Sequence, residues 1–499
     1  MLTLTTFRRV SLAIFSGLVS YFAYPSPNFW PAIFLSVAGL YISIRGLGFW
    51  KATWIGFIGG AAFYVAQIYW ISQYLGPEPL IALAGLEAII YAFAAGFIGL
   101  ITSRTLKPWL LSLAVACLWT GREWLATHFP YGGFPWSRVA MSQADSPLAF
   151  WVSVGGFGLL SFLIVAFTIF TVETYKVRRK QSVRPLIVAV VALVAVPVAL
   201  SALPPTIEGS VRIAGIQGNA NAGLFSNEER GTILQNHLDA TEQLLAANEK
   251  FDVVVWPENA SDINPDDDAS VHATLTKLVN DSLKSPLIFG TITTTGDRMY
   301  NSSKLWVPGR GEVDQYDKKR PVPFGEYVPD REFFYKLSPE LIGMIYRGYD
   351  FGTRDGIFEV NGQKLGILIC FEEAIDELPR ELVSSGASII IAQTNNADFG
   401  HSDESVQQLA IARLRAIETG RSIVNISTVG PSAIIDSRGK LLDVSDAYVA
   451  DYLVANVPKS SAMTIAMLGG WMFDPAMAYL AAILAIWMMV DNRRKTTKL

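Results

Sequence analysis

The chain changes character at Val211–Gln217, where the sequence reads VRIAGIQ. Long apolar runs precede this stretch, and short β-branched segments follow it. A polar amphipathic helix is predicted at 227–249, and a buried strand at 252–256 comes next. Such alternation of strands and helices is typical of a layered α/β fold. We therefore predict one α/β domain at 206–465, which at roughly 260 residues is large enough to form its own core.

The rest of this region repeats the same pattern. Further strands are predicted at 287–294, 304–307, 356–360, 365–370, 388–393 and 423–427, and further helices at 268–284, 374–385 and 403–419. Several polar residues follow the ends of these strands, which is where open α/β sheets place their binding sites.

The remainder of the chain has the composition of a membrane protein. Hydrophobic residues make up 51% of the 499 residues, and 13 residues are Trp. Apolar runs of membrane-spanning length occur at 8–24, 29–45, 52–75, 79–102, 108–127, 148–172, 185–204 and 474–491. We therefore predict a multi-pass α-helical membrane domain with seven spans at 1–205, and a C-terminal span with a cytoplasmic tail at 466–499.

The basic residues between these spans predict the orientation. They occupy alternate connections: Arg8, Arg9, Arg45, Lys51, Arg104, Lys107 and the cluster at 176–184. The intervening connections carry no Lys or Arg, apart from Arg138 in the third. By the positive-inside rule the basic connections are cytoplasmic, so the α/β domain is expected to be extracytoplasmic.

Cys370 ends one predicted strand, in the sequence GILICFEE, and is the only cysteine of the α/β region. The other cysteine, Cys117, lies in an apolar run, so no disulfide is expected between them. A lone thiol at a strand end is a candidate nucleophile. A free cysteine is also commonly a small buried hydrophobe, and for this residue alone both interpretations stay open.

Two other segments deliver charged groups into loops. The strand in VVVWPEN, 253–259, stops at a proline and is followed by Glu258, whose partly desolvated carboxylate suits proton transfer near neutral pH. The loop YDKKRPVPFGEYVP, 316–329, is stiffened by three prolines and carries Lys318 and Glu326. Taken singly, Glu258 could be an ordinary surface carboxylate. Lys318 and Glu326 could be an ordinary solvated salt bridge.

Together the three segments offer a base, a cation and a thiol. Glu258 could take the thiol proton, and Cys370 could then attack an ester or amide carbonyl. The ammonium of Lys318 could stabilise the oxyanion of the tetrahedral intermediate.

At these residues the sequence resembles the nitrilase superfamily, whose Glu-Lys-Cys triad lies on an α-β-β-α sandwich. With seven spans before the domain and one after it, the whole chain more closely resembles the apolipoprotein N-acyltransferases, a membrane-embedded family of that superfamily. The matching motifs are Trp256-Pro257-Glu258, the block from Lys318 to Glu326, and Cys370-Phe371-Glu372.

The resemblance implies roles for individual residues. Glu258 corresponds to the general base, Lys318 to the oxyanion stabiliser and Cys370 to the nucleophile. Glu326 and Glu372 correspond to further acids that orient Lys318 and the loop around Cys370. In a supporting position, Phe371 stands where the family often has Tyr.

The resemblance also implies the substrates. The acyl donor is a membrane phospholipid, and the acceptor is the α-amino group of the diacylglyceryl-modified N-terminal cysteine of an apolipoprotein. The acyl group is carried as a thioester between two half-reactions. The expected location is the plasma membrane of a bacterium, with the catalytic domain on the extracytoplasmic side.

Other positions bear on the lipid substrates. Trp136, in the motif GGFPW, matches a family loop on the outer side. Phe324, Tyr327 and Asn395 are further candidates for contact with substrate or lipid. The family pattern has an aromatic residue where this chain has Asp398, and Phe225 is the ring nearest to an expected Trp. These departures concern the acyl chain or the acceptor rather than the class of reaction.

Two other functions stay open. A membrane-anchored nitrilase-like hydrolase would share the triad and release the acyl group to water, but a simple anchor needs one span. A transporter or lipid-binding scaffold would lack catalysis, and the few ionisable residues in the spans give an ion path little support. Arg122 and Glu123 are one pair of ionisable residues in these spans. They could be functional, or they could lie at the membrane interface.

Metal, cofactor and nucleic-acid functions find no support in the sequence. The four His show no metal-ligand spacing, and the net charge of −4 comes without a basic block in the α/β region. We therefore expect no metal, no other cofactor and no nucleic-acid partner.

Overall fold

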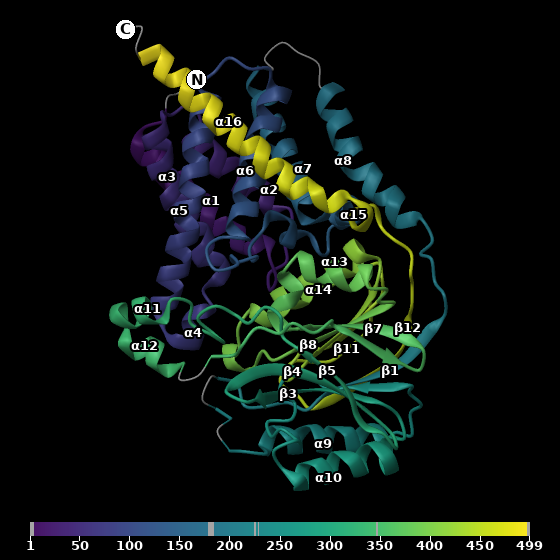
Figure 1. Ribbon diagram of the computed structural model, residues 1–499. Coiled ribbons are helices and arrows are strands. Elements are labelled where there is room, and N and C mark those ends of the chain that lie inside the picture. The colour runs from purple at the N-terminus through teal and green to yellow at the C-terminus, as the bar shows by residue number, and fades with distance from the viewer. Residues whose placement is uncertain (1–3, 178–183, 224–225, 228, 346–347, 497–499) are drawn as a thin grey trace. The chain divides into compact units, whose positions relative to one another are not determined.

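A computed structural model describes residues 4–177, 184–223, 226–227, 229–345 and 348–496 (Figure 1). The chain divides into two compact units. The helical unit comprises Met1–Ser72, Gly76–Pro204 and Thr464–Leu499, and the α/β unit comprises Gln73–Leu75 and Pro205–Met463. Phe225, the ring singled out in the sequence, lies outside the described residues.

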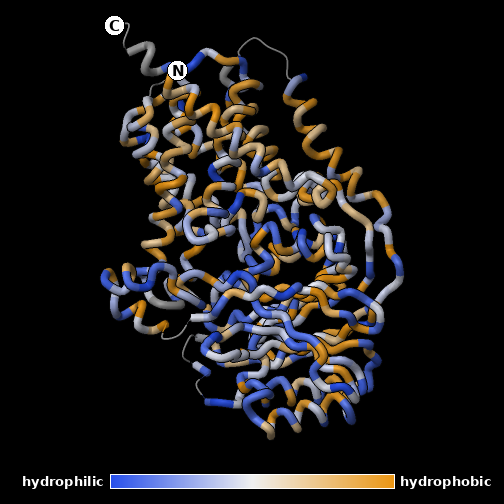
Figure 2. The backbone as a smooth tube through the Cα atoms, viewed as in Figure 1, coloured by the Kyte–Doolittle hydropathy of each residue, from blue (hydrophilic) through white to orange (hydrophobic). Residues whose placement is uncertain are grey.

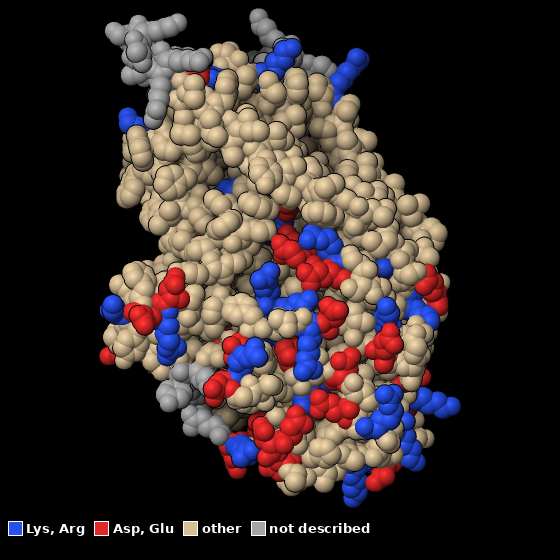
Figure 3. All heavy atoms as spheres, in the orientation of Figure 1, with Lys and Arg blue, Asp and Glu red and all other residues tan. Residues whose placement is uncertain are grey.

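Apolar helices lie at the positions of the predicted spans. They are α1 (Thr6–Val19), α2 (Ala32–Ile44), α3 (Phe49–Ile68), α5 (Pro77–Thr102), α6 (Pro108–Ala126), α7 (Val152–Val177), α8 (Arg184–Ala202) and α16 (Phe473–Thr496). Two short helices are α4 (Ile71–Leu75), whose last three residues belong to the α/β unit, and α15 (Ile465–Leu468), which precedes the last predicted span. Figure 2 shows hydrophobic residues along these helices, and on the visible face in Figure 3 they carry few charges.

Four helical segments of the described chain are long and apolar enough to cross a membrane. They are Pro77–Thr102, Pro147–Tyr175, Arg184–Ala202 and Gly470–Asp491. The helical unit is thus suited to a membrane. The number of eight crossings and their orientation stay predictions.

Small residues let α3 and α5 pack closely. A Cβ atom added to Gly56 would lie 2.2 Å from the Cβ of Ala95, and one added to Gly99 would lie 2.4 Å from the Cβ of Ala52. No Cβ atom fits at distances this short, so both positions require glycine. Close backbone approach through small residues is how helices associate in lipid.

The pair Arg122 and Glu123 is buried inside the helical unit, with 4% and 3% exposure. Arg122 donates a 2.6 Å hydrogen bond to the hydroxyl of Tyr64, and its guanidinium lies 4.9 Å from the ring centre of Tyr91. Both side chains therefore lie in the core of this unit, and the two interpretations left open by the sequence, functional and interfacial, stay open.

The described residues of the α/β unit form two six-stranded sheets. Their orders are β12-β1-β2-β3-β4-β5 and β11-β10-β9-β8-β7-β6. The strands are β1 (Ser210–Gln217), β2 (Val253–Val255), β3 (Leu287–Thr295), β4 (Arg298–Val307), β5 (Gly311–Asp317), β6 (Ile357–Val360), β7 (Gln363–Ile369), β8 (Ile389–Thr394), β9 (Ser422–Ser427), β10 (Ala433–Ile435), β11 (Leu441–Val444) and β12 (Asp451–Pro458). The inner strands β1-β2-β3 and β7-β8-β9 run parallel.

The sheets pack face to face between two layers of helices (Figure 1). Alternate residues of each strand point to opposite faces, so Ile213 of β1 and Ile367 of β7 share the core between the sheets. The residue that follows each of these two isoleucines points to the outer face of its sheet and packs under helices. The helices are α9 (Thr232–Ala246) and α10 (Ala269–Lys277) on the first sheet, and α13 (Glu377–Ser384) and α14 (Glu404–Thr419) on the second.

The structure corrects some of the predicted boundaries. The helix predicted from residue 227 begins only at Thr232, because Asp262 caps it from a distant loop. Its carboxylate accepts hydrogen bonds from the backbone N–H groups of Gly231, at 2.5 Å, and Leu234, at 3.0 Å. The strand predicted at 365–370 ends at Ile369, and Cys370 begins a short 3-10 helix.

Candidate active site

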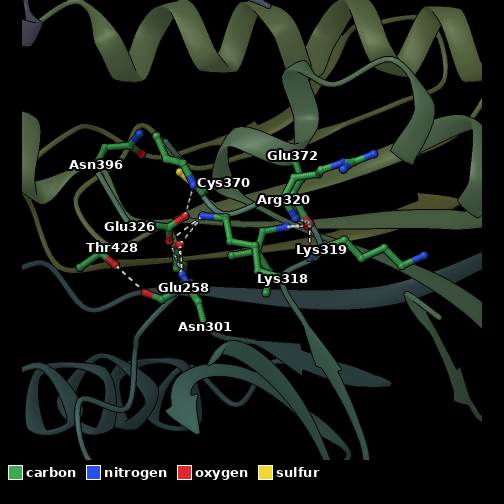
Figure 4. A network of polar contacts seen from close by, with 12 residues as sticks. Glu258, Asn301, Lys318, Lys319, Arg320, Glu326, Cys370, Glu372, Asn396 and Thr428 are labelled. Atoms are coloured by element: carbon green, nitrogen blue, oxygen red, sulfur yellow. Dashed lines mark hydrogen bonds and ion pairs between the residues drawn. The ribbon is translucent and has the colours of Figure 1, made fainter. Parts of the chain in front are cut away.

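Glu258, Lys318 and Cys370 follow the ends of three strands, β2 and β5 of the first sheet and β7 of the second. Figure 4 shows Glu258 and Lys318 pointing toward one another, with Cys370 beside them. The structure thus brings together the three residues that the sequence predicts as a base, a cation and a thiol.

Backbone contacts hold the turn that carries Glu258. The carbonyl of Trp256 accepts a 2.6 Å hydrogen bond from Gln393, and that of Pro257 accepts a 3.1 Å bond from the N–H of Gly290. A Cβ atom on Gly290 would lie 2.6 Å from the Pro257 oxygen. Only glycine leaves room for this turn, so the position of Glu258 depends on the neighbouring strand β3.

Lys318 lies between two carboxylates. Its Nζ donates to Oε1 of Glu326 at 2.9 Å and to Oε1 of Glu258 at 3.2 Å. Nδ2 of Asn301 donates to the same two oxygen atoms, at 2.9 and 2.6 Å. Lys318 is 1% exposed and Glu258 is 4% exposed, so the interactions are shielded from solvent.

Burial and charge act in opposite directions in this cluster. Burial alone would lower the pKa of Lys318, but the carboxylates of Glu258 and Glu326 raise it well above its usual value. Burial raises the pKa of Glu258, and the ammonium of Lys318 opposes this rise. The lysine therefore stays charged, while Glu258 can exchange a proton closer to neutral pH than an exposed glutamate.

Cys370 has an unusual backbone conformation, with φ at +54°. A residue with a Cβ atom adopts this left-handed conformation at a cost, and such residues cluster at functional sites. Burial raises the pKa of the thiol well above its usual value, and the charge of Glu258 raises it further. The thiol is therefore protonated at neutral pH and needs a base in order to react.

Glu372 links the loop of Lys318 to the strand of Cys370. Its carboxylate accepts hydrogen bonds from the backbone N–H groups of Lys319, at 2.8 Å, and Ile369, at 2.9 Å. It also accepts one from the hydroxyl of Tyr316 at 3.0 Å. Glu372 is fully buried, and burial raises its pKa to about 7. This residue thus ties together the chain segments next to Lys318 and Cys370.

The remaining predicted residues lie in different surroundings. Phe371 is buried beside Cys370. The ring of Phe324 packs edge-on against Phe334 at 4.8 Å, and that of Tyr327 packs against Phe351 at 4.9 Å, in the loop that also carries Glu326. Oδ1 of Asn395 accepts a 3.2 Å hydrogen bond from the backbone N–H of Ala397, within the same turn. Trp136 belongs to the helical unit, where it is buried against Trp70 and Phe134.

Sequence reasoning missed several polar groups of the site. Asn301 lies within β4, in the run Tyr-Asn-Ser-Ser at 300–303, and this polar run inside a strand was the signal available. Glu404 follows β8 and was also missed, and burial raises its pKa to about 8. Asp398, which the sequence had singled out as a departure from the family pattern, lies nearby in the chain, and burial raises its pKa to about 7. Because burial raises the pKa of Asp398 and Glu404, these two acids add less negative charge around the thiol at neutral pH than exposed carboxylates would.

Comparison with known proteins identifies related families for both parts of the chain. Residues 16–170 match the family model of the apolipoprotein N-acyltransferase N-terminal domain, and residues 212–466 match that of the carbon-nitrogen hydrolases.

The relatives match over most of their length. A protein named apolipoprotein N-acyltransferase from Allorhizobium ampelinum is 30% identical, with 88% of each chain covered. Proteins of the same name from Mycolicibacterium smegmatis and Vibrio parahaemolyticus are 29% and 27% identical. They cover 97% and 96% of this chain, and 86% and 97% of their own length is matched.

Solved structures are similar to about half of this chain. The crystal structure of an amidase from Nesterenkonia sp. is 15% identical, with a TM-score of 0.39, and covers 51% of this chain and 92% of its own. The resemblance predicted from the sequence is confirmed by the family models and the relatives. The chain belongs to the apolipoprotein N-acyltransferase family, and its residues 212–466 form a carbon-nitrogen hydrolase domain.

Proposed function

We propose that this protein transfers a fatty acyl chain from a membrane phospholipid to the α-amino group of the N-terminal diacylglyceryl cysteine of an apolipoprotein. The acyl group is held between the two steps as a thioester on Cys370. One observation carries this proposal: a single thiol, in a strained left-handed conformation, lies beside a buried Glu258–Lys318 pair in a chain of this family.

The first half-reaction forms the thioester. Glu258 takes the proton from Cys370, and the thiolate attacks the ester carbonyl of the phospholipid. The ammonium of Lys318 stabilises the negative oxygen of the tetrahedral intermediate. When the intermediate collapses, the lysophospholipid oxygen leaves and receives the proton that Glu258 took from the thiol.

The second half-reaction returns the enzyme to its starting state. The neutral α-amino group of the apolipoprotein attacks the thioester carbonyl, and Glu258 accepts the proton that the nitrogen loses. Lys318 again stabilises the oxyanion. The C–S bond then breaks, the amide is released, and the thiolate of Cys370 takes the proton back from Glu258.

Glu326, Glu372 and Phe371 support these groups. Glu326 keeps Lys318 charged and directs its ammonium, because it accepts the shorter of the two lysine contacts, at 2.9 Å. Glu372 fixes the segments beside Lys318 and Cys370 through its backbone contacts. Phe371 fills a buried position next to the thiol.

A lipid donor requires apolar surface near the catalytic groups. Phe324 and Tyr327 lie in the Glu326 loop, which leads into α11 (Arg331–Leu337) and α12 (Pro339–Met344). Exposed apolar side chains follow in this segment: Phe333, Tyr335, Leu337, Met344 and Phe351. Large exposed apolar groups favour contact with the membrane interface. We assign this segment, with Asn395 and Trp136, to substrate and lipid contact.

The helices and the basic connections support a membrane setting. We propose a helical membrane domain at 1–205 with seven spans, a catalytic domain at 206–465 and a last span within 466–499, in the plasma membrane of a bacterium. The alternation of basic connections supports placing the catalytic domain on the extracytoplasmic side. The four long apolar helices support membrane insertion.

A transfer assay tests the proposal. The purified full-length protein is incubated with phospholipid that carries a labelled acyl chain, and then with a diacylglyceryl peptide that has a free N-terminal amine. We expect the label on the peptide amine. Release of the label to water alone would favour a hydrolase, and failure of the protein to take up any label would favour a lipid-binding scaffold.

A further inference from the structure

A side-chain amide on α14 contacts the thiol from a side that the triad does not occupy. Nε2 of Gln408 lies 3.8 Å from Sγ of Cys370, within reach of an N–H···S hydrogen bond. Gln408 is 2% exposed, so water does not compete for this contact. Catalytic hydrogen bonds are often long before substrate binds, and they tighten as charge develops.

The neighbours of Gln408 determine which end of its amide faces the sulfur. Nδ2 of Asn396 donates to Oε1 of Gln408 at 2.6 Å and to Oε2 of Glu404 at 2.7 Å. Because the Gln408 oxygen is occupied in this way, its NH₂ group is left to face Cys370.

Asn396 is itself held in one orientation. Its Oδ1 accepts hydrogen bonds from the hydroxyls of Ser427, at 2.6 Å, and Thr394, at 3.2 Å. A flipped Asn396 amide would point its oxygen at Oε1 of Gln408, with no hydrogen between the two oxygen atoms. Asn396 lies beside Cys370 in Figure 4.

The charges around the sulfur make such a donor useful. The titratable groups that act on Cys370 are Glu258 after β2, Lys318 after β5, Glu326 in the following loop and Glu404 on α14. Three of the four are acids, which disfavour a thiolate when they are ionised. A neutral N–H donor stabilises the thiolate without adding a charge that would compete with Lys318 for the oxyanion.

We propose that Gln408 is a further catalytic residue of the acyl transfer: its amide N–H donates to the Cys370 thiolate, and Asn396 is the positioning residue that orients this amide. The inference rests on the proposed thioester mechanism. In that mechanism the thiolate occurs twice, as the nucleophile toward the phospholipid and as the leaving group when the amine attacks. Gln408 would therefore act in both half-reactions.

The test measures the reactivity of the thiol directly, without lipid. The full-length protein is treated with iodoacetamide across a range of pH, and alkylation of Cys370 is followed by peptide mass. In Gln408→Leu we expect alkylation at neutral pH to fall about tenfold or more, since hydrogen bonds to charged groups are among the stronger ones, and the pH profile to move to higher pH. Gln407→Leu, which replaces the neighbouring buried amide of the same helix, is the control and should alkylate like the unmodified protein.

Asn396→Asp provides a second, nearly isosteric variant. An aspartate carboxylate accepts from Gln408 instead of donating to it, so the Gln408 amide turns and presents its oxygen to the sulfur. We expect the same direction of change as in Gln408→Leu. In the double variant the two effects should not add, because Asn396 acts through Gln408.

Three outcomes would overturn the inference. One is wild-type alkylation in Gln408→Leu, another is full additivity in the double variant, and the third is an equal loss in Gln407→Leu. Labelling of the same proteins with acyl-labelled phospholipid keeps the two proposals distinct. If the wild type is acylated on Cys370 while Gln408→Leu keeps wild-type thiol reactivity, only the role of Gln408 fails. If the wild type takes up no acyl group, the proposed function fails.

Discussion

Glu258→Gln separates the proton-transfer role of this residue from its structural role. The glutamine has the same shape, and its oxygen can still accept from Asn301 and Lys318, which lie 2.6 and 3.2 Å from Oε1 of Glu258. Glu326 remains 2.9 Å from the lysine, so Lys318 keeps one carboxylate partner. The main loss is therefore the base.

The size of the effect follows from the state of the thiol. Burial keeps the pKa of Cys370 well above its usual value, so without a base the thiolate is scarce at neutral pH. A positioned general base is worth about 10²- to 10⁴-fold in rate. We expect acyl-enzyme formation to fall by that factor at pH 7, with no change in the temperature of unfolding beyond a few degrees.

The pH profile gives a second readout. In the wild type the rate should rise as Glu258 loses its proton, at a pH above the usual carboxyl range because burial raises its pKa, and then level off. In Glu258→Gln the thiolate must form without help, so the rate should continue to rise about tenfold per pH unit up to alkaline pH.

Single-turnover acylation by labelled phospholipid, followed across pH, measures both quantities. Glu381→Gln is the control, because Glu381 is an exposed carboxylate paired with Lys319 at 3.0 Å. A Glu258→Gln variant that acylates at close to the wild-type rate would refute the reasoning. A slower variant with an unchanged pH profile would also refute it.

Three further predictions concern the neighbouring residues. Lys318→Met should lower kcat about 10²- to 10³-fold in steady-state transfer assays, because the oxyanion loses its cation, and an undiminished kcat would contradict this role. Glu372→Ala should cost about 3 kcal/mol or more of stability in denaturant unfolding, since the donors of Tyr316, Lys319 and Ile369 lose their acceptor, and a loss below 1 kcal/mol would contradict it. Because burial raises the pKa of Glu404 to about 8, the folded protein holds this proton more tightly than the unfolded chain, so stability should fall as pH rises from about 4.5 to 8. Glu404→Gln should reduce that slope in thermal unfolding measured across pH, and an unchanged slope would exclude Glu404 as its source.

Local pattern was sufficient to predict most of the elements. Long apolar runs became helices, and β-branched runs such as Val253–Val255 became the inner strands of the sheets, because burial on both faces demands continuous apolar residues. The outer strands were harder to predict. Gly311–Asp317 alternates exposed and half-buried residues along much of its length, and Asp451–Pro458 is held by pairing with β1, more than 200 residues earlier in the chain. Neither signal is visible in a local window.

The residues of the site also divide into those that the sequence could predict and those that it could not. Glu258, Lys318 and Cys370 could be named because each lies in a recognisable motif. Asn301 and Gln408 were not named, because their importance depends on which side chains they meet in the fold. The left-handed backbone of Cys370 was equally hidden, since the sequence predicts an extended residue there.

The most direct test of the central claim is the mass of the peptide that contains Cys370. After incubation of the full-length protein with phospholipid of one defined acyl chain, we predict that this peptide gains the mass of that chain. Hydroxylamine and a diacylglyceryl peptide should each remove it, the latter with transfer to the peptide amine. An acyl group on any other residue, or transfer that proceeds undiminished in Cys370→Ala, would contradict the account.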